Sequence, residues 1–504
     1  MVAGIRTPAH TGHLPGGGVQ RLLPAGILLL TAAALLIARP DGHYGLVLAV
    51  VPFVAAAVHG VTGTAVVGTL TVGAYVVLRH QLLEGGTGVW LIKLACVAGA
   101  AVLATVMAQG RVRGRALTHT RELALALQEG LLPQHLPPTS AVQVCHRYVP
   151  ADTDAGVGGD WYDVIPLSGA RVALVIGDVA GHGIHAAAMM GRLRTAVQTL
   201  ADLDLPPDEL LARLDDLVIR TGQNEHKPEL AATCLYLVYD PVTAHCSMSG
   251  AGQPPPALLH PDGRVEFAPL CPQPPLGVGG TRFTALDLAL PPGTVIALYT
   301  DGLLDLRRHH SDIALDHLAH TLGTAGPNLD EIADRVCASP HNTTDDDIAL
   351  LLARTRTLPP STVATWQYPA TARSVPQARA AVGGQLNAWD LPELLPSTEL
   401  AVSELVTNAV THGGGPVTVR LIRDRALICE VTDTGDSAPR PRRAAALDEG
   451  GRGLDLVAQL TDRWGTRSTG TGKTVWIEQA LPHPDASEGV ARTAERPADI
   501  LERT

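Results

Sequence analysis

The sequence predicts a multidomain protein with an all-α transmembrane region, followed by two successive α/β domains. Three observations predict this order. The first 120 residues are almost free of charge, apolar strands in the middle of the chain end in aspartates, and the last third combines a polar-faced helix with glycine clusters. The chain has 504 residues, which is too long for one core because a domain usually has about 100–200 residues.

Charge is divided unevenly along the chain. Residues 1–120 contain eight Lys or Arg and two acidic residues, which gives a charge of +6. Since the net charge of the chain is −11, the other 384 residues carry −11 − 6 = −17. The mean hydropathy of +0.16 is high for a wholly soluble protein. The first part is almost uncharged and the rest is acidic, which argues against a nucleic-acid partner, because a nucleic-acid binder should have a strongly basic domain. The seven cysteines are scattered and form no Cys-x-x-Cys pair, so the sequence favours a reducing cytosol over a disulfide framework or a zinc site.

Residues 1–116 are expected to form the membrane region. A membrane-spanning helix needs about 20 mostly apolar residues, and uncharged runs of nearly that length or longer occur here. They predict four spans, over residues 22–38, 43–58, 61–78 and 88–109. Basic residues precede the first span and follow the last, so the positive-inside rule places both termini and both α/β domains in the cytoplasm of a multi-pass cell-membrane protein. A buried helical domain is the alternative, and the missing polar helix faces disfavour it.

Residues 117–138 are expected to be a connector helix that ends near Pro133. Its leucines do not follow a clean heptad, so packing against the next domain is the simpler interpretation. Signal transmission through a paired helix is a further hypothesis.

Residues 139–356 are expected to form the first α/β domain. Four of its segments place acids beside apolar strands: GGDWYD (158–163), GDVAGHG (177–183), YTDG (299–302) and DDD (345–347). A single Asp-Gly usually marks a turn, but four such segments suggest carboxylates gathered at one edge of a sheet. Carboxylates that converge in a dry cleft repel one another unless cations neutralise them, and oxygen ligands suit Mg²⁺ or Mn²⁺. This pattern predicts a phosphohydrolase with two metal ions.

The combination of GGDWYD, GDVAGHG, YTDGLLD and DDDIALLL resembles the PPM-type metal-dependent protein phosphatases, in the branch of stage II sporulation protein E. The resemblance covers about residues 118–355. It implies that two Mn²⁺ or Mg²⁺ ions activate water to attack a phosphoserine or phosphothreonine, with no covalent intermediate. By position it makes Asp160 and Asp178 the bridging, catalytic ligands. The remaining metal ligands would be the Val179 carbonyl for one ion and Asp301 and Asp346 for the second, with Asp345 or Asp347 as alternatives to Asp346.

After a linker at 357–364, residues 365–481 are expected to form the second α/β domain, and residues 482–504 a disordered tail. The helical run 398–412 places Glu404 and Asn408 on one face, four residues apart. A strand then ends at Asp433, which Gly435 follows closely. Further on, a glycine cluster at 450–453 opens a helix, whose N-terminus suits phosphates.

These elements, in this order, resemble the GHKL-type ATPases and, within them, the small serine kinases that act as anti-sigma factors. The resemblance implies that Asn408 binds Mg²⁺, that Glu404 is a general base and that Asp433 recognises adenine. Gly435, Gly451 and Gly453 would line the nucleotide pocket. The first glycine box reads DTGDS (433–437), where the family usually has a second glycine, and the lid is short. ATP with Mg²⁺ is therefore the expected ligand, and protein serine kinase activity is a separate, second expectation.

Together the two resemblances imply a membrane-anchored switch enzyme. The phosphatase would act on a phosphorylated STAS-type anti-sigma-factor antagonist, and the ATPase domain would act on the same antagonist or capture a sigma factor. The family also implies a homodimer. Two alternatives remain open: a membrane sensor histidine kinase, which needs a two-helix module bearing a phosphoacceptor histidine before its ATPase, and a scaffold whose ATPase domain only binds a partner.

Overall fold

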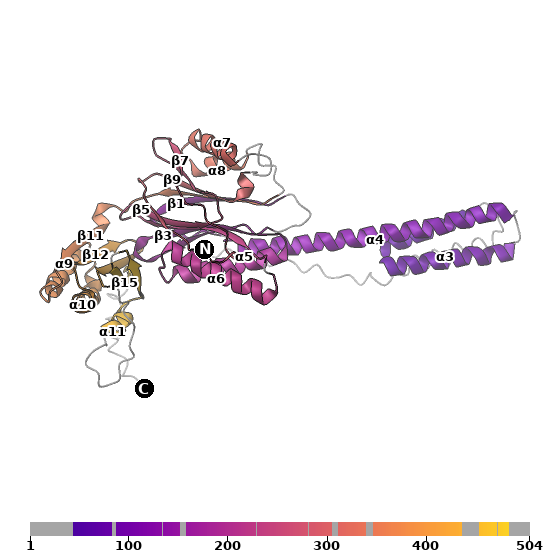
Figure 1. Ribbon diagram of the computed structural model, residues 1–504. Coiled ribbons are helices and arrows are strands. Elements are labelled where there is room, and N and C mark those ends of the chain that lie inside the picture. Colours follow the sequence, from indigo (N-terminus) through magenta and orange to yellow (C-terminus); the bar gives the residue numbers. More distant parts are fainter. Residues whose placement is uncertain are drawn as a thin grey trace, which may run out of the picture. The chain divides into compact units, whose positions relative to one another are not determined.

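The computed structural model describes residues 44–482 apart from short internal gaps. The gaps are 83–86, 134, 152–157, 228, 281, 305–310, 339–345, 436–452 and 471. The chain divides into two compact units, Met1–Leu123 and Ala124–Thr504, and each is described by itself (Figure 1).

The first unit is helical. It contains η1 (Tyr44–Ala49), α2 (Val50–Val58), α3 (Val61–Leu82) and most of α4 (Thr87–Leu131). Within it α3 and α4 approach closely, because a Cβ at Gly68 would lie 3.0 Å from the Ala101 side chain.

Among the described residues, one helix is long and apolar enough to cross a membrane, Trp90–Arg113, with a mean hydropathy of 2.2. The apolar helices Val47–Val58 and Val61–Val77 are shorter. The expected first span, 22–38, lies outside the described residues, so the four-span arrangement stays a prediction. The segment expected as the fourth span and the expected connector helix form one uninterrupted helix, α4, which ends at Leu131, near the predicted end at Pro133.

The second unit begins with a domain of two antiparallel five-stranded sheets. Their strand orders are β2-β3-β4-β5-β8 and β1-β10-β9-β6-β7. The strands of the first sheet are β2 (Trp161–Pro166), β3 (Val172–Val179), β4 (Ala232–Asp240), β5 (His245–Ala251) and β8 (Leu286–Ala289). Those of the second are β1 (Val142–Val149), β10 (Ile348–Thr355), β9 (Val295–Tyr299), β6 (Ala257–Leu259) and β7 (Val265–Phe267).

Four layers follow from the burial of these strands. Successive side chains of β3 point to opposite faces, so Leu174 packs between the sheets and Val175 packs under helices. The helices α5 (Ile184–Ala201) and α6 (Pro207–Glu225) cover the first sheet, and α7 (Ser311–Gly323) and α8 (Leu329–Cys337) cover the second. Because both faces of β3 are buried, its sequence is a continuous apolar run rather than an alternating one.

The next domain has one antiparallel sheet, in the order β11-β12-β13-β15-β14. Its strands are β11 (Val363–Tyr368), β12 (Val417–Arg423), β13 (Ala426–Asp433), β15 (Gly472–Ala480) and β14 (Arg463–Thr469). Helices α9 (Ser374–Ala388), α10 (Leu395–Asn408) and α11 (Gly453–Leu460) pack on it through one apolar core. Strand β11 already begins inside the expected linker. The expected succession of two α/β sandwich domains is confirmed.

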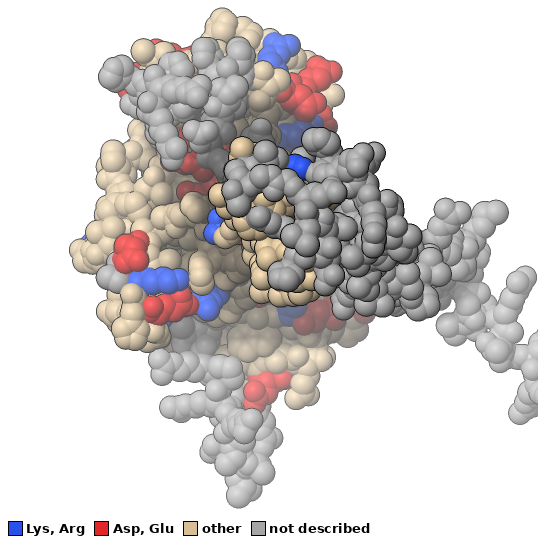
Figure 2. Space-filling model, turned by 90° about the vertical axis from the view of Figure 1, so that its right-hand side faces the viewer, with Lys and Arg blue, Asp and Glu red and all other residues tan. Residues whose placement is uncertain are grey.

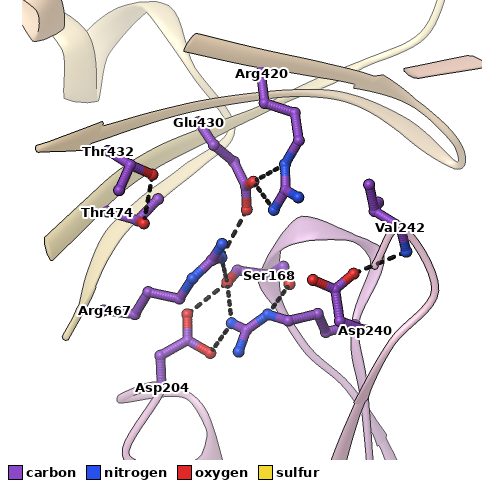
Figure 3. A network of polar contacts seen from close by, with 10 residues as sticks. Ser168, Asp204, Asp240, Val242, Arg420, Glu430, Thr432, Arg467 and Thr474 are labelled. Atoms are coloured by element: carbon purple, nitrogen blue, oxygen red, sulfur yellow. Dashed lines mark hydrogen bonds and ion pairs between the residues drawn. The ribbon is translucent and has the colours of Figure 1, made fainter. Parts of the chain in front are cut away.

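A charged network joins the two domains of this unit (Figure 3). Arg171 pairs with Asp204 at 2.7 Å, and Arg467 pairs with Glu430 at 2.6 Å. The Arg467 guanidinium also donates to the Ser168 hydroxyl at 3.4 Å, from one domain to the other. Beside it, Gly169 has a φ of +68°, and a Cβ there would overlap the Glu430 carboxylate.

Candidate functional site

Strand pairing brings the predicted acids to one end of the two-sheet domain. In the first sheet Trp161 pairs with Gly177, so Asp160 and Asp178, the next residues outward, face each other. In the second sheet Tyr299 pairs with Leu350, which places Asp301 beyond the end of β9 and Asp346 before the start of β10. Acids far apart in sequence therefore meet where β3 ends and β10 begins.

The charges of these acids affect one another's pKa values. Asp160 is only 2% exposed, and its burial, followed by the nearby Asp178 charge, raises its pKa well above the ordinary value. Burial also raises the pKa of Asp178 to about 6, with further contributions from the charges of Asp301, Asp346 and Asp347. Repulsion of this kind is what divalent cations relieve.

Two contacts fix the acids in place. The buried Thr300 hydroxyl donates to Asp160 Oδ2 at 2.7 Å and accepts the Ala349 amide at 2.9 Å, so it links the two sheets. Asp347 is buried and accepts the Ala151 amide at 2.6 Å. Asp346 is exposed. Asp346 Oδ1 accepts the Asp347 amide at 3.0 Å, so each of these two acids accepts one backbone amide.

The two glycines before Asp160 leave room for the acids. A Cβ at Gly158 would overlap Asp347 Oδ2. A Cβ at Gly159 would overlap the Val179 carbonyl oxygen and lie 2.8 Å from Asp178 Oδ1. Any side chain at either position would therefore displace an oxygen atom of the cluster.

The donor set fits hard divalent cations. It consists of oxygen atoms, some buried, whose raised pKa values report uncompensated negative charge. Within the described residues, no group of three or more His, Cys, Asp or Glu side chains is arranged to hold a metal ion, so the structure shows gathered acids and not a formed coordination shell. Asp160, Asp178, Asp301, Asp346 and the Val179 carbonyl would hold the ions. Bound there, the ions would neutralise phosphoryl charge and lower the pKa of water.

Other residues near the cluster have plainer roles. His182 is exposed in the loop after β3, as expected of a loop histidine. Trp161 and Tyr162 are buried and pack on opposite faces of β2. On the face shown in Figure 2, basic side chains lie scattered among acidic and uncharged ones, and its described residues form no continuous basic stripe.

The second domain gathers its predicted residues around the end of α10. Glu404 lies on this helix and Asn408 is its last residue. A Cβ at Gly453, the first residue of α11, would overlap the Glu404 carboxylate. The N-terminus of α11 therefore lies against Glu404, where its amides suit an anion. Gly451 lies outside the described residues.

Asp433 ends β13, where glycines pack closely around it. It is 3% exposed, and its Oδ1 accepts from the Gly435 amide at 2.8 Å and from Lys473 Nζ at 2.9 Å. A Cβ at Gly413 would lie 2.5 Å from the same oxygen. The structure thus places Asp433 beside Gly435, as expected, and adds Lys473.

Comparison with known families follows the same division of the chain. The family model "Stage II sporulation protein E (SpoIIE)" matches residues 168–356, and the model "Histidine kinase-like ATPase domain" matches residues 368–478. The chain carries a SpoIIE-type phosphatase domain followed by a histidine kinase-like ATPase domain.

Individual relatives cover parts of the chain. "Phosphoserine phosphatase RsbP" of Bacillus subtilis (strain 168) is 25% identical over 241 residues, which are 46% of this chain and 57% of the relative. "Protein IcfG" of Synechocystis sp. is 26% identical over 205 residues, 36% of this chain and 32% of the relative. The chain thus spans about half or less of these relatives. The crystal structure of the RsbU and RsbW domains of Rv1364c from Mycobacterium tuberculosis has 25% identity and a TM-score of 0.40, and the match covers 70% of this chain and 96% of that one.

Sequence reasoning missed two residues of these sites. Thr300 directly precedes Asp301 in the YTDG segment, and that position was the only available signal for it. Lys473 stands in the GTGKT segment before the last strand. Its contact with Asp433 depends on the register of β13 and β15 in the ATPase domain.

Proposed function

We propose that the SpoIIE-type domain hydrolyses phosphoserine or phosphothreonine in a protein substrate, with two Mn²⁺ or Mg²⁺ ions. The observation that carries the proposal is the facing pair Asp160 and Asp178, whose pKa values are raised by burial and by neighbouring carboxylates. Structural carboxylates are normally neutralised by partners, whereas this group retains its repulsion. The relative RsbP bears the name phosphoserine phosphatase.

The residues of the chain would share the work as follows. Asp160 and Asp178 would bind the metal ions between the sheets. The Thr300 hydroxyl fixes the orientation of Asp160. Gly158 and Gly159 keep the approach to these oxygens free of side chains. Asp346, at the exposed side of the cluster, would complete the ligand set where a phosphorylated side chain can enter.

We further propose that the substrate is a phosphorylated STAS-type anti-sigma-factor antagonist. The ATPase domain would bind ATP with Mg²⁺, using Asn408 as the metal ligand and Glu404 as the general base. It would phosphorylate the same antagonist or bind a sigma factor, and the protein would work as a homodimer. The succession of the two domain types supports this proposal. It also disfavours a sensor histidine kinase, because a two-sheet domain stands where that class has its phosphoacceptor helices.

We also propose that the first unit anchors the protein in the cell membrane as a multi-pass region, with both termini and both enzymatic domains in the cytoplasm. The support is the apolar helix Trp90–Arg113 and its exposed side chains. Ile92 is 67% exposed and Val102 is 65% exposed within the described residues. Apolar side chains exposed along one helix are suited to lipid.

The test uses the full chain and phosphorylated STAS-domain proteins from the same genome. With Mn²⁺, wild type should release phosphate, and EDTA should abolish the release. Asp178→Asn should lower kcat at least about a hundredfold, since it removes a ligand oxygen and a charge. The matched control is Asp216→Asn, which changes an exposed aspartate on α6. Equal activity of Asp178→Asn and wild type would exclude the proposed centre.

A further inference from the structure

A buried charge pair lies at the end of β13. Asp433 and Lys473 are paired residues of neighbouring antiparallel strands, and their side chains meet at 2.9 Å. Asp433 is 3% exposed and Lys473 is 8% exposed. Removing two charges from water is costly, so a pair in this position calls for a role beyond stability.

The hydrogen bonds of the pair leave one acceptor and one donor. Asp433 Oδ1 accepts from the Gly435 amide and from Lys473, whereas Oδ2 accepts no hydrogen bond from the described residues. Lys473 Nζ donates to Asp433 and, at 3.4 Å, to the Gly435 carbonyl. An ammonium group has three N–H donors, so one remains. The pair therefore offers a carboxylate oxygen beside an N–H group.

Glycines allow three backbone segments to pack closely around this pair. A Cβ at Gly435 would lie 3.0 Å from Lys473 Nζ, and one at Gly472 would overlap the Asp433 carbonyl. On the other side, a Cβ at Gly413 would lie against the Asp433 carboxylate. Three backbone segments thus approach the charge pair closely, which suits a flat ligand inserted edge-on.

We propose that Lys473 is a specificity-determining residue of the nucleotide pocket, donating to N1 of adenine while Asp433 accepts from the 6-amino group. The inference rests on the proposed binding of ATP. Adenine presents a donor at position 6 beside an acceptor at N1, which matches the free Asp433 oxygen and the free Lys473 N–H. The 6-amino group is the part of the base farthest from the ribose, so it meets the more deeply buried Asp433. A 6-oxo purine reverses both groups and would be rejected.

The experiment measures the binding of three nucleotides to the full-length protein in the presence of Mg²⁺: ATP, 1-deaza-ATP, in which N1 is a C–H group, and inosine triphosphate. Wild type should bind ATP about tenfold more tightly than 1-deaza-ATP, because one hydrogen bond to a charged donor is lost. Lys473→Met should weaken the binding of ATP about tenfold. The ratio of its affinities for ATP and 1-deaza-ATP should then be about one. The conservative control Lys473→Arg should keep the ratio above one, because it retains a charged donor.

The outcomes separate the two proposals. If wild type binds ATP but does not distinguish it from 1-deaza-ATP, or if Lys473→Met keeps the full ratio, the role of Lys473 is excluded and ATP binding stands. A preference for inosine triphosphate would also exclude the role of Lys473, because the donor and acceptor of the base would then be reversed. If ATP does not bind at all, both proposals fail. The wild-type ratio needs no variant, so a misfolded Lys473→Met would leave the test intact.

Discussion

At the scale of single residues, the acid cluster lowers the stability of the folded protein when no metal is bound. Asp160 and Asp178 face each other, and the pKa of each is raised. A raised carboxyl pKa means that folding favours the protonated form. Deprotonation at neutral pH therefore works against the fold until cations are bound.

The first prediction concerns pH. The pKa of Asp178 is about 6 in the folded chain against an ordinary 3.8. Its stabilising contribution should therefore be complete below about pH 4 and lost as the pH rises through about 6. A shift of about two units corresponds to at most ~3 kcal/mol. In EDTA, the thermal unfolding midpoint of the SpoIIE-type domain should decrease as the pH is raised from 5 to 7. Adding Mn²⁺ at pH 7 should restore the midpoint.

The matched variant for this measurement is Asp178→Asn, which cannot titrate. Its midpoint in EDTA should change less between pH 5 and pH 7 than that of wild type. A steeper fall in the variant than in wild type would contradict the prediction.

The second prediction concerns Thr300. Thr300→Val keeps the shape of the side chain and removes the hydroxyl that donates to Asp160 at 2.7 Å. A hydrogen bond to a charged group contributes about 1.5–3 kcal/mol, so the Mn²⁺ concentration needed for half-maximal phosphatase activity should rise about tenfold or more. Thr300→Ser retains the hydroxyl and should stay close to wild type. Titrating phosphate release with Mn²⁺ checks both variants, and equal curves for Val and Ser would refute the role.

Sequence could predict the acids but not their partners. Asp160, Asp178 and Asp301 were found because each lies beside an apolar strand or a glycine. Thr300 and Lys473 look ordinary in sequence, because Thr300 contacts an acid of the other sheet and Lys473 contacts an acid of the neighbouring strand. The sequence states neither arrangement.

At the scale of elements, α5 is held on the first sheet by buried apolar side chains. Leu193 lies fully buried in the core between this helix and the sheet. Strand β3 passes under the same core and carries Asp178 at its end. The packing of α5 therefore supports the strand that presents the acid.

The third prediction follows from this packing. Leu193→Ala should lower the free energy of unfolding by about 2–5 kcal/mol, because it removes buried methyl groups and leaves a cavity. Leu203→Ala is the matched control, since Leu203 is 59% exposed, and it should change stability by less than about 0.5 kcal/mol. Urea unfolding followed by fluorescence measures both, and similar losses for the two would contradict the assigned core.

The sequence predicted some elements better than others. The expected apolar strands beside GDVAGHG, YTDG and DDD are present as β3, β9 and β10, and each is buried almost continuously. Strands β5 and β8 were not predicted, since β5 consists mostly of small or polar residues. The connector was expected as a separate helix. The segment after the apolar run contains no proline, and its glycines do not end α4.

At the scale of the whole molecule, the two domains of the second unit are joined by more than a linker. Ala170 of the first domain packs with Ile422 and Ile428 of the second. The charged network of Figure 3 lies beside this contact, with Arg467 reaching Ser168. These contacts should make the unfolding of one domain depend on the other.

The fourth prediction uses two glycines with positive φ. Gly169 has a φ of +68° and Gly263 a φ of +86°, so alanine is strained at both. A Cβ at Gly263 has nothing within 4 Å, whereas one at Gly169 overlaps Glu430 in the ATPase domain. Gly169→Ala should therefore lower stability by about 1–3 kcal/mol more than Gly263→Ala. Calorimetry should also show the domains of Gly169→Ala melting at more widely separated temperatures, and identical melting of the two variants would refute the contact.

The turn at Gly169 limits how freely such enzymes can be assembled from parts. An ATPase domain grafted from another protein would have to leave room for the turn at Gly169 and bring its own counterpart of Arg467, which donates to Ser168 across the junction. We expect successful chimaeras to exchange both sides of this junction together, so that the two domains are inherited as a matched pair.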